Sequence, residues 1–205
     1  MFNSNYSKKN LFWGEKPNRL LNNITEFKKN SKVLDLGTGE GKDSIYLAKL
    51  GFDVTGVDIS RPGIDKLNNI IKQNKLNVKT IVEDIRNFEF NETYDIVLCF
   101  TVLQLLNLYE INEMIKKIQD HTNTSGINII TSFTKNNPNK QCPYTNKDGT
   151  YQQYYLFDNN ELKNYYEKDK WKILHYDEYE TPYHKHGDIE EEHKHEMVAI
   201  IAKKT

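Results

Sequence analysis

Short apolar runs alternate with longer amphipathic segments along most of this chain. Compact runs rich in Val, Ile and Leu are typical of buried strands, whereas apolar positions that recur every three or four residues indicate helices. The predicted strands cover residues 32–36, 53–57, 78–82, 95–100 and 127–133, and the predicted helices cover residues 42–50, 61–74 and 108–121. This alternation predicts a doubly wound, mostly parallel α/β sheet, because each strand–helix–strand unit returns the chain in the same direction.

Capping signals mark the start of two helices. Asn107 and Glu110 have the spacing of a capping box at the start of the helix over 108–121. Asp158 and Glu161 have the same spacing, which predicts a further helix over residues 159–168. Both helices are therefore expected to begin at side chains that accept hydrogen bonds from their first backbone amides.

The C-terminal part of the chain has a different pattern. Residues 134–157 are rich in Tyr and contain Pro, which predicts a long loop that is either functional or mobile. Two β-rich runs follow, at 171–181 and 196–203. Because a short connection joins them, they can only pair antiparallel, and the sheet is expected to end in an antiparallel hairpin.

The composition is that of a folded protein. The 205 residues are 37% hydrophobic, and 28 Lys and Arg stand against 29 Asp and Glu, so the formal net charge is −1. A chain of this length can bury a core and is expected to form a single domain over residues 1–205. A charge so close to zero produces no global field that would attract nucleic acid or an anionic lipid surface.

The expected location is the cytoplasm. No apolar stretch approaches the ~20 residues that cross a bilayer, and the first ten residues have lysines but no following apolar core, unlike a secretory signal. The two cysteines, Cys99 and Cys142, are too few and too far apart for a disulfide framework. We therefore expect a cytoplasmic protein without a membrane partner.

The sharpest sequence feature is a glycine-rich turn between the first strand and the first helix. It reads GTGEG at 37–41 and follows Asp35 at the end of the strand. Glycines allow a tight turn and let a ligand approach the backbone closely. The spacing G-x-G-x-G differs from the G-x-G-x-x-G of dinucleotide-binding proteins. The carboxylate would repel a pyrophosphate, but it suits a cationic group such as an ammonium or a sulfonium.

Two further acids follow the next two strands. Asp58 comes directly after strand 53–57, and Asp84 follows strand 78–82. A carboxylate at the first position accepts hydrogen bonds from ribose hydroxyls in nucleoside-binding sheets, and one at the second would accept from an exocyclic amine such as that of adenine. Because the carboxyl ends of parallel strands meet at one edge of the sheet, the acids and the glycine turn predict a nucleoside pocket there.

Together these motifs resemble those of the class I S-adenosylmethionine-dependent methyltransferases. The similar segments are LDLGTGEG at 34–41, GVDIS at 56–60, EDI at 83–85 and YDIVLCFTVLQLL at 94–106. Within that family, FWGEKPN at 12–18 and the paired histidines before the last strand look most like the small-molecule methyltransferases associated with tellurite resistance. The resemblance covers residues 11–133 and implies a Rossmann-like methyltransferase sheet with strand order 3-2-1-4-5-7-6.

The resemblance also implies a division of the chain. It comprises an N-terminal lid or helix over 1–30, a cofactor-binding core over 31–133, an acceptor-side loop over 134–157, and a C-terminal helix and hairpin over 158–205. The aromatic residues of the first part, Tyr6, Phe12 and Trp13, form either a lid over the cofactor or a hydrophobic staple for the first helix.

S-adenosylmethionine is the cofactor that the resemblance implies. Its methionine part would pass over the backbone of 37–39, near Asp35, and its ribose would be held by Asp58. Phe100 would lie beside the sulfonium, and Thr101 and Gln104 would line the boundary between cofactor and acceptor. The complete set of expected cofactor-binding residues is Asp35, Gly37, Thr38, Gly39, Gly41, Asp58, Ile59, Asp84, Ile85, Phe100 and Thr101.

Four histidines flank the connection between the last two β runs, namely His184, His186, His193 and His195. Residues two apart in an extended chain share a face, so the hairpin could gather four imidazoles that suit a divalent metal such as Zn, Ni or Fe. They could instead bind an oxyanion, supply a general base, or be solvated at the hairpin tip. The candidate catalytic residues are His184, His186 and Tyr144.

The indicated function is methyl transfer to a small-molecule acceptor, such as a chalcogen oxyanion or a thiol. One alternative is a non-catalytic nucleoside- or metal-binding protein that uses the histidine cluster. Another is a nicotinamide-dependent oxidoreductase, although its glycine spacing would differ and no Ser/Tyr/Lys catalytic set is evident. A methyltransferase of nucleic acids is disfavoured because it usually needs a basic groove, and the net charge is near zero.

Overall fold

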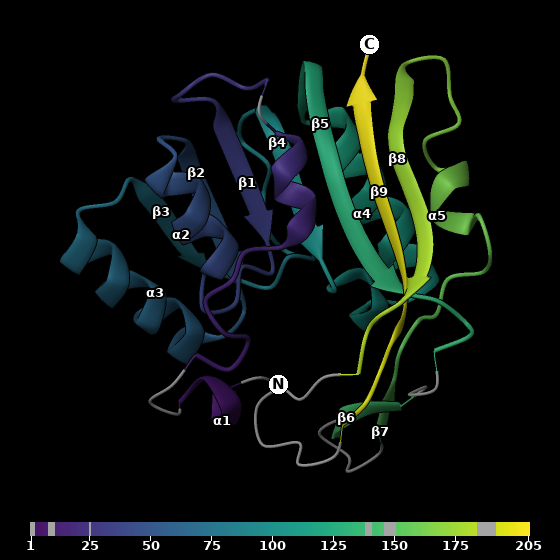
Figure 1. Ribbon diagram of the computed structural model, residues 1–205, viewed down its shortest axis with the longest axis horizontal. Coiled ribbons are helices and arrows are strands. Elements are labelled where there is room, and N and C mark those ends of the chain that lie inside the picture. Colours follow the sequence, from purple (N-terminus) through teal and green to yellow (C-terminus); the bar gives the residue numbers. More distant parts are fainter. Residues whose placement is uncertain (1–2, 8–10, 25, 138–140, 146–150, 184–191) are drawn as a thin grey trace. The chain divides into compact units, whose positions relative to one another are not determined.

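The computed structural model describes the chain except for residues 1–2, 8–10, 25, 138–140, 146–150 and 184–191 (Figure 1). The chain divides into two compact units, Met1–Leu98 and Cys99–Thr205. The first unit carries the glycine-rich turn and the acids that follow the strands, and the second carries the end of the fourth strand and the C-terminal hairpin. The assignment of the whole chain to one domain stays a prediction.

Among the described residues, seven strands form one mixed sheet in the order β3-β2-β1-β4-β5-β9-β8. Strand β2 pairs parallel with β1 and with β3, whereas β9 pairs antiparallel with β5 and with β8. The expected strand order and the antiparallel C-terminal hairpin are therefore confirmed. The bounds are β1 Lys32–Leu36, β2 Asp53–Asp58, β3 Val78–Val82, β4 Tyr94–Phe100, β5 Thr122–Phe133, β8 Trp171–Glu180 and β9 Glu196–Lys204.

Among the described residues of the first unit, three α-helices and one 3-10 helix accompany β1, β2 and β3 (Figure 1). They are α1 Asn3–Tyr6, the 3-10 helix η1 Arg19–Asn23, α2 Lys42–Lys49 and α3 Arg61–Asn74. Helix α3 begins where the Ser60 side chain accepts a hydrogen bond from the Gly63 amide at 3.4 Å. Ile45 of α2 packs with Ile64 and Leu67 of α3, so the start of α2, and with it the glycine turn, lies against α3.

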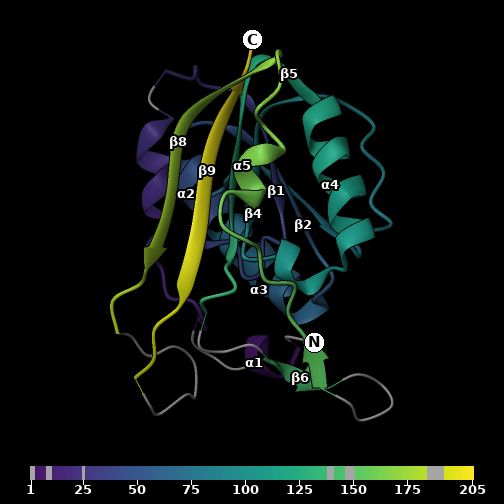
Figure 2. The ribbon, with the colours of Figure 1, turned by 90° about the vertical axis from the view of Figure 1, so that its right-hand side faces the viewer.

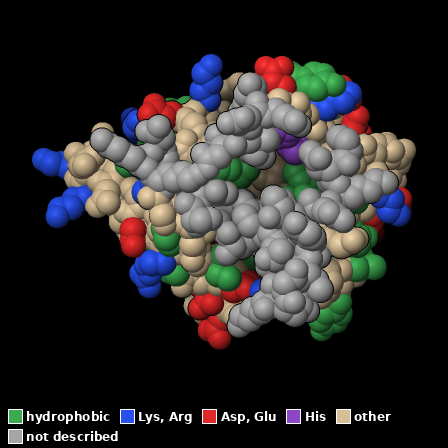
Figure 3. Space-filling model, turned by 90° about the horizontal axis from the view of Figure 1, so that it is seen from below, with side chains coloured by type: hydrophobic (Ala, Val, Ile, Leu, Met, Phe, Trp, Pro, Cys, Tyr) green, Lys and Arg blue, Asp and Glu red, His purple; other side chains and the backbone are tan. Residues whose placement is uncertain are grey.

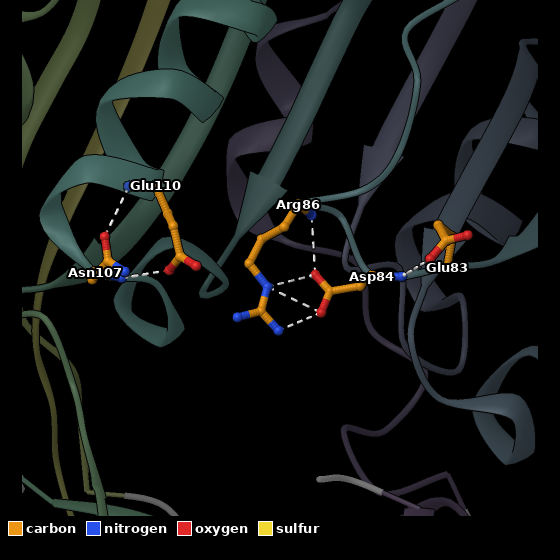
Figure 4. Close-up of polar contacts among 5 residues, drawn as sticks. All are labelled: Glu83, Asp84, Arg86, Asn107 and Glu110. Atoms are coloured by element: carbon orange, nitrogen blue, oxygen red, sulfur yellow. Dashed lines mark hydrogen bonds and ion pairs between the residues drawn. The ribbon is translucent and has the colours of Figure 1, made fainter.

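In the second unit, α4 (Leu108–Asp120) packs on β5 and α5 (Glu161–Asn164) packs on β9 (Figure 2). The side chain of Asn107 accepts from the Glu110 amide at 3.0 Å, and the Glu110 carboxylate accepts from the Asn107 amide at 2.9 Å (Figure 4). The predicted capping box is therefore confirmed. The apolar stripe that α4 buries recurs every three or four positions, at Ile111, Met114, Ile115 and Ile118.

The helix predicted over 159–168 is much shorter than expected, because α5 covers only Glu161–Asn164. Its N-terminal cap is Asn160 in the left-handed conformation, at φ 60, rather than Asp158. The carboxylate of Asp158 instead pairs with the Lys135 ammonium at 2.6 Å. One half of the predicted capping box is present, since the Glu161 carboxylate accepts from the Asp158 amide at 2.8 Å. The other half is not, because the Asp158 side chain binds Lys135 rather than an amide of the helix.

The start of β5 and the content of the predicted loop also differ from the predictions by more than one residue. Strand β5 begins at Thr122, five residues before the predicted start at Ile127, directly after α4. The Thr122 hydroxyl donates to Ile118 O at 2.6 Å and accepts from the Asn128 amide group at 2.7 Å, so polar residues extend the strand. The predicted loop over 134–157 contains a two-stranded antiparallel sheet, β6 Gln141–Thr145 with β7 Tyr151–Gln153.

The helices of both units are modest in length, and α3 has 14 residues. Within the part of the chain that the structure describes, none of the helices combines the length and apolar character needed to span a bilayer.

Candidate functional site

The backbone amides of the glycine-rich turn after β1 donate hydrogen bonds to β2. The amides of Gly37 and Thr38 donate to Val57 O at 2.8 and 3.0 Å, and the amide of Gly39 donates to Asp58 Oδ2 at 2.8 Å. Dinucleotide-binding turns offer such amides to a phosphate, whereas here they already have partners. The φ angles are positive, between 58° and 82°, at Gly37, Gly39 and Gly41, a conformation that glycine adopts freely.

Asp35 is buried at the end of β1, beneath this turn. Its Oδ2 accepts hydrogen bonds from Thr38 Oγ1 at 2.8 Å and from Ser44 Oγ at 2.6 Å. Burial, and then the nearby carboxylate of Asp43, raises the pKa of Asp35 to about 7. The carboxyl therefore changes charge near neutral pH, and a cationic ligand group beside it would favour its charged form.

The raised pKa of Asp35 leads to a testable pH dependence. At pH values between the ordinary pKa of 3.8 and the folded pKa of about 7, Asp35 keeps its proton in the folded chain but has released it in the unfolded chain. The stabilisation that comes from this proton is complete below the unfolded pKa and is lost as the pH rises through the folded pKa. We expect the free energy of unfolding of the wild type to fall relative to that of Asp35→Asn across this range, by as much as ~4 kcal/mol.

Urea denaturation of the two proteins between about pH 4 and about pH 8 measures this difference. Asparagine keeps an oxygen that can accept from the two hydroxyl groups but carries no charge. Parallel stability curves over the whole range would contradict the raised pKa.

Asp58, at the end of β2, lies directly beside the glycine turn. Its Oδ2 accepts from the Gly39 amide and its Oδ1 from the Ser60 amide, each at 2.8 Å. Burial raises the pKa of Asp58, and these two amides oppose that shift. An ionised carboxylate has about four acceptor positions, so one remains on each oxygen. Two adjacent acceptor positions suit the two hydroxyls of a ribose, and the residues present therefore fit a nucleoside.

Asp84, after β3, is paired with Arg86 (Figure 4). The guanidinium donates to both carboxylate oxygens, and the Arg86 amide donates to Oδ1 at 3.0 Å. These bonds from Arg86 lower the pKa of Asp84. A ligand amine would have to share the carboxylate with Arg86, so the expected adenine contact stays a prediction. Ile85, which follows Asp84, is buried. Ile59, which follows Asp58, is 54% exposed and offers apolar surface there.

The N-terminal segment covers the glycine turn. Tyr6 is buried, and a Cβ placed on Gly39 would lie 2.8 Å from its hydroxyl oxygen. The indole of Trp13 donates to that hydroxyl at 2.9 Å, and the side chain of Asn3 accepts from the Ser60 hydroxyl at 2.8 Å. These contacts join the aromatic segment to the turn, as a lid requires, and the role as a lid stays a prediction.

Two acids that the sequence analysis did not single out hold this segment in place. The carboxylate of Glu40 accepts from the Phe12 amide at 2.6 Å and pairs with the Lys66 ammonium at 2.5 Å. The carboxylate of Asp43 accepts from the Asn18 amide at 2.7 Å. Both acids are buried. Their positions, in a glycine turn and in the first turn of a helix, are equally typical of solvated acids near a helix N-terminus, so the sequence carried no distinguishing signal.

In the second unit, the chain makes a left-handed turn directly after β4. Thr101 has a φ of 54°, which is unusual for a β-branched residue. Its amide donates to Thr131 O at 2.9 Å, and its carbonyl oxygen accepts from Gln104 Nε2 at 2.7 Å. Phe100 ends β4 just before this turn. The expected contact of Phe100 and Thr101 with a cofactor stays a prediction.

An aromatic cluster of Phe133, Tyr154, His193 and His195 also lies in the second unit. The Phe133 ring stacks on the His195 imidazole with centroids 4.9 Å apart, and Tyr154 packs edge-on to Phe133 at 5.1 Å. The His193 ring lies edge-on to His195 at 5.0 Å. The structure therefore brings together two of the four histidines that the sequence analysis grouped.

The metal site expected at the four histidines stays a prediction. Within the described ranges of the chain, no group of three or more His, Cys, Asp or Glu is arranged to hold a metal ion. His184 and His186 lie outside the described residues, and Tyr144 falls within β6. The catalytic roles considered for these three residues are predictions as well.

Solved structures identify the fold as that of the class I S-adenosylmethionine-dependent methyltransferases. A methyltransferase of this kind from Methanosarcina mazei matches 91% of this chain and 97% of its own, with a TM-score of 0.70 at 19% identity. The crystal structure of TehB from Haemophilus influenzae covers 100% of this chain and 66% of its own, with a TM-score of 0.75 at 30% identity. The fold implied by the sequence motifs is confirmed.

The chain belongs to the TehB family. The family model described as tellurite resistance protein TehB matches residues 6–201. A curated relative from Haemophilus influenzae, the probable S-adenosyl-L-methionine-dependent methyltransferase TehB, is 35% identical over 173 residues, which are 84% of this chain and 57% of the relative. The chain thus spans little more than half the length of the curated relatives it matches.

Proposed function

We propose that this chain is an S-adenosylmethionine-dependent methyltransferase that acts on a small-molecule acceptor. The observation that carries the proposal is the carboxylate of Asp58, which the amides of Gly39 and Ser60 orient at the end of β2. One acceptor position remains on each oxygen for the ribose of the cofactor. Membership of the TehB family supports the proposal, as does the description of the Haemophilus influenzae relative.

Residues of the first unit would hold the cofactor. Asp58 would accept from the ribose hydroxyls, and the exposed side chain of Ile59 would supply apolar surface for the adenine. The buried Ile85, which follows Asp84, would frame the adenine from the end of β3. Asp84 would accept from the adenine amine. Asp35 lies beneath the turn, where the ammonium of the methionine part would favour its charged form. The engaged amides of the turn favour this cofactor over a nicotinamide dinucleotide, whose pyrophosphate needs such donors.

When bound, the cofactor supplies a methyl group on a positively charged sulfur: the acceptor's lone pair forms the new bond to carbon, and the carbon–sulfur electron pair stays on sulfur. This transfer needs no oxidant or reductant. The protein has mainly to align the acceptor, and orientation can supply ~7–11 kcal/mol of the barrier. Tyr6, Phe12 and Trp13, which lie near the glycine turn, would exclude water from the cofactor.

Residues of the second unit would receive the acceptor. The His195 imidazole is half-buried and stacks on the buried Phe133 ring, so it would be the part of this pair that meets the acceptor. An anionic acceptor such as a chalcogen oxyanion or a thiolate presents its lone pair without losing a proton. A hydroxyl or amine acceptor would need a general base, for which His184, His186 and Tyr144 are the candidates.

The distribution of charge supports a small acceptor. Among the described residues on the face drawn in Figure 3, basic and acidic side chains lie interspersed rather than gathered by sign. A nucleic-acid surface is usually a basic patch or groove. Together with the net charge of −1 over the whole chain, this face favours a small acceptor over nucleic acid or an anionic membrane surface.

Titration calorimetry and an acceptor panel test the proposal. S-adenosylmethionine should bind with measurable heat and raise the melting temperature. Selenite, tellurite and 2-mercaptoethanol, each added in metal-free buffer, should then yield S-adenosylhomocysteine at a rate that depends on the acceptor. Neither heat nor a shift in melting temperature with the cofactor would overturn the proposal. Stabilisation by NAD instead would favour the oxidoreductase, and cofactor binding without transfer to any acceptor would favour a binding protein.

A further inference from the structure

We propose that Gln104 is a positioning residue that holds Thr101 in its left-handed conformation and thereby sets the end of β4 for the acceptor. The inference rests on the proposed function, because it concerns the acceptor side of the same reaction. Gln104 acts through Thr101 and the segments it joins, so it is not a catalytic residue in this proposal.

Thr101 is held in a conformation that its own side chain disfavours. At φ 54° the Cβ of a β-branched residue crowds the neighbouring peptide, so such residues persist there only where the surroundings impose it. Thr101 is exposed, and its hydroxyl donates to the preceding carbonyl oxygen, Phe100 O, at 2.7 Å. The conformation is therefore imposed through the backbone, by the bonds from Thr101 N to Thr131 O and from Gln104 Nε2 to Thr101 O.

Gln104 is built into the structure through both ends of its amide and through its backbone. It is 3% exposed. Its Nε2 donates to Thr101 O at 2.7 Å, and its Oε1 accepts from the Ser132 hydroxyl at 3.1 Å. Its carbonyl oxygen accepts from the Tyr155 amide at 2.8 Å. Only a side chain with both a donor and an acceptor makes the two amide contacts at once.

The partners of Gln104 lead to the aromatic cluster. Ser132 is followed by Phe133, which stacks on His195, and Tyr155 is preceded by Tyr154, which packs on Phe133. Gln104 is thus linked to the aromatic cluster through the backbone, because each of these two partners is one residue away from a member of the cluster. Strained backbone of this kind is concentrated at functional sites, and ligands of such sheets bind beyond the carboxyl ends of the strands.

A double-variant experiment distinguishes whether Gln104 stabilises the backbone conformation of Thr101 or contacts the substrate directly. Gln104→Met keeps the length of the side chain and removes its amide. We expect it to lower kcat for methyl transfer to selenite or 2-mercaptoethanol about tenfold, which corresponds to one lost hydrogen bond of ~1.4 kcal/mol. The Kd for S-adenosylmethionine should change less than about twofold. In a Thr101→Gly background the same change should lower kcat by less than about twofold, because glycine adopts positive φ without help.

Ser132→Ala is the matched control, since it removes the contact at the other end of the amide and leaves the bond to Thr101. We expect it to retain kcat within about threefold, as one neutral hydrogen bond is lost away from the turn. Equal losses of kcat from Gln104→Met in both backgrounds would overturn the inference, because Gln104 would then act independently of the conformation at Thr101.

Urea denaturation of the same four proteins (wild type, the two single variants and the double variant) gives a second reading that needs no acceptor. Gln104→Met should destabilise the wild-type background more than the Thr101→Gly background, and equal destabilisation would overturn the hold on the backbone. Absence of transfer by the wild type to either acceptor would overturn the proposed function and the acceptor role of Gln104 with it. The denaturation cycle would still decide whether Gln104 holds the turn.

Discussion

Replacing Asp58 with alanine is expected to weaken the binding of S-adenosylmethionine about 10- to 100-fold. The loss of charge-assisted hydrogen bonds to the ribose corresponds to roughly 1.5–3 kcal/mol. The same change releases the amides of Gly39 and Ser60 from their 2.8 Å contacts with the carboxylate, so the glycine turn loses one of its links to β2 and keeps the bonds from Gly37 and Thr38 to Val57 O. Titration calorimetry of the purified variant measures the dissociation constant directly.

Asp53→Ala is the matched control, because Asp53 begins the strand that Asp58 ends. Its carboxylate accepts from the side chain of Asn77 at 3.0 Å at the opposite edge of the sheet. We expect this control to bind the cofactor within about twofold of the wild type, as for an exposed contact away from the ligand. An unchanged dissociation constant for Asp58→Ala would show that Asp58 does not bind the ribose of the cofactor.

Gly41→Ala is expected to destabilise the fold by ~3 kcal/mol, which lowers the melting temperature by roughly 6–12 °C. Gly41 has a φ of 82°, where an L side chain is strained, and an added Cβ would lie 2.3 Å from Leu67 Cδ1. Leu67 is fully buried beside Ile45 and Ile64, so it has no free volume into which to move. Thermal and urea denaturation measure the change.

Gly14→Ala is the control that separates the backbone strain at positive φ from the steric clash with Leu67. Gly14 has a φ of 71°, but an added Cβ would meet nothing within 4 Å. We expect only the conformational penalty, about 1 kcal/mol. If the two variants were equally stable, Leu67 would not constrain the glycine turn, and the packing of α2 on α3 would not explain the glycine at this position.

Local patterns predicted most of the regular structure. The bounds of β1, α3 and β3 agree with the ranges predicted from the sequence. Buried strands and amphipathic helices can be predicted in this way because their hydrophobic periodicity involves residues that are close in sequence. The prediction was wrong at α5, where Asp158 pairs with Lys135. That contact spans 23 residues along the chain, and no short window of sequence contains both partners.

The candidate site divides in the same way. Asp35, Asp58 and Asp84 were found from the sequence because each lies at or just after the carboxyl end of a predicted strand, and parallel strands end at a common edge. The sequence did not indicate that Arg86 holds Asp84 or that Glu40 receives the Phe12 amide. Charged side chains with such partners look the same in sequence as solvated ones.

By itself, the amino-acid sequence determined the alternating strands and helices, the glycine turn and the acids at the strand ends, because these follow from interactions between near neighbours. Only the tertiary structure decided which acids are buried, how Tyr6 lies against Gly39, and how Gln104 holds Thr101. The physical reason is that burial and backbone strain depend on segments far apart along the chain, which fold together only when the core forms.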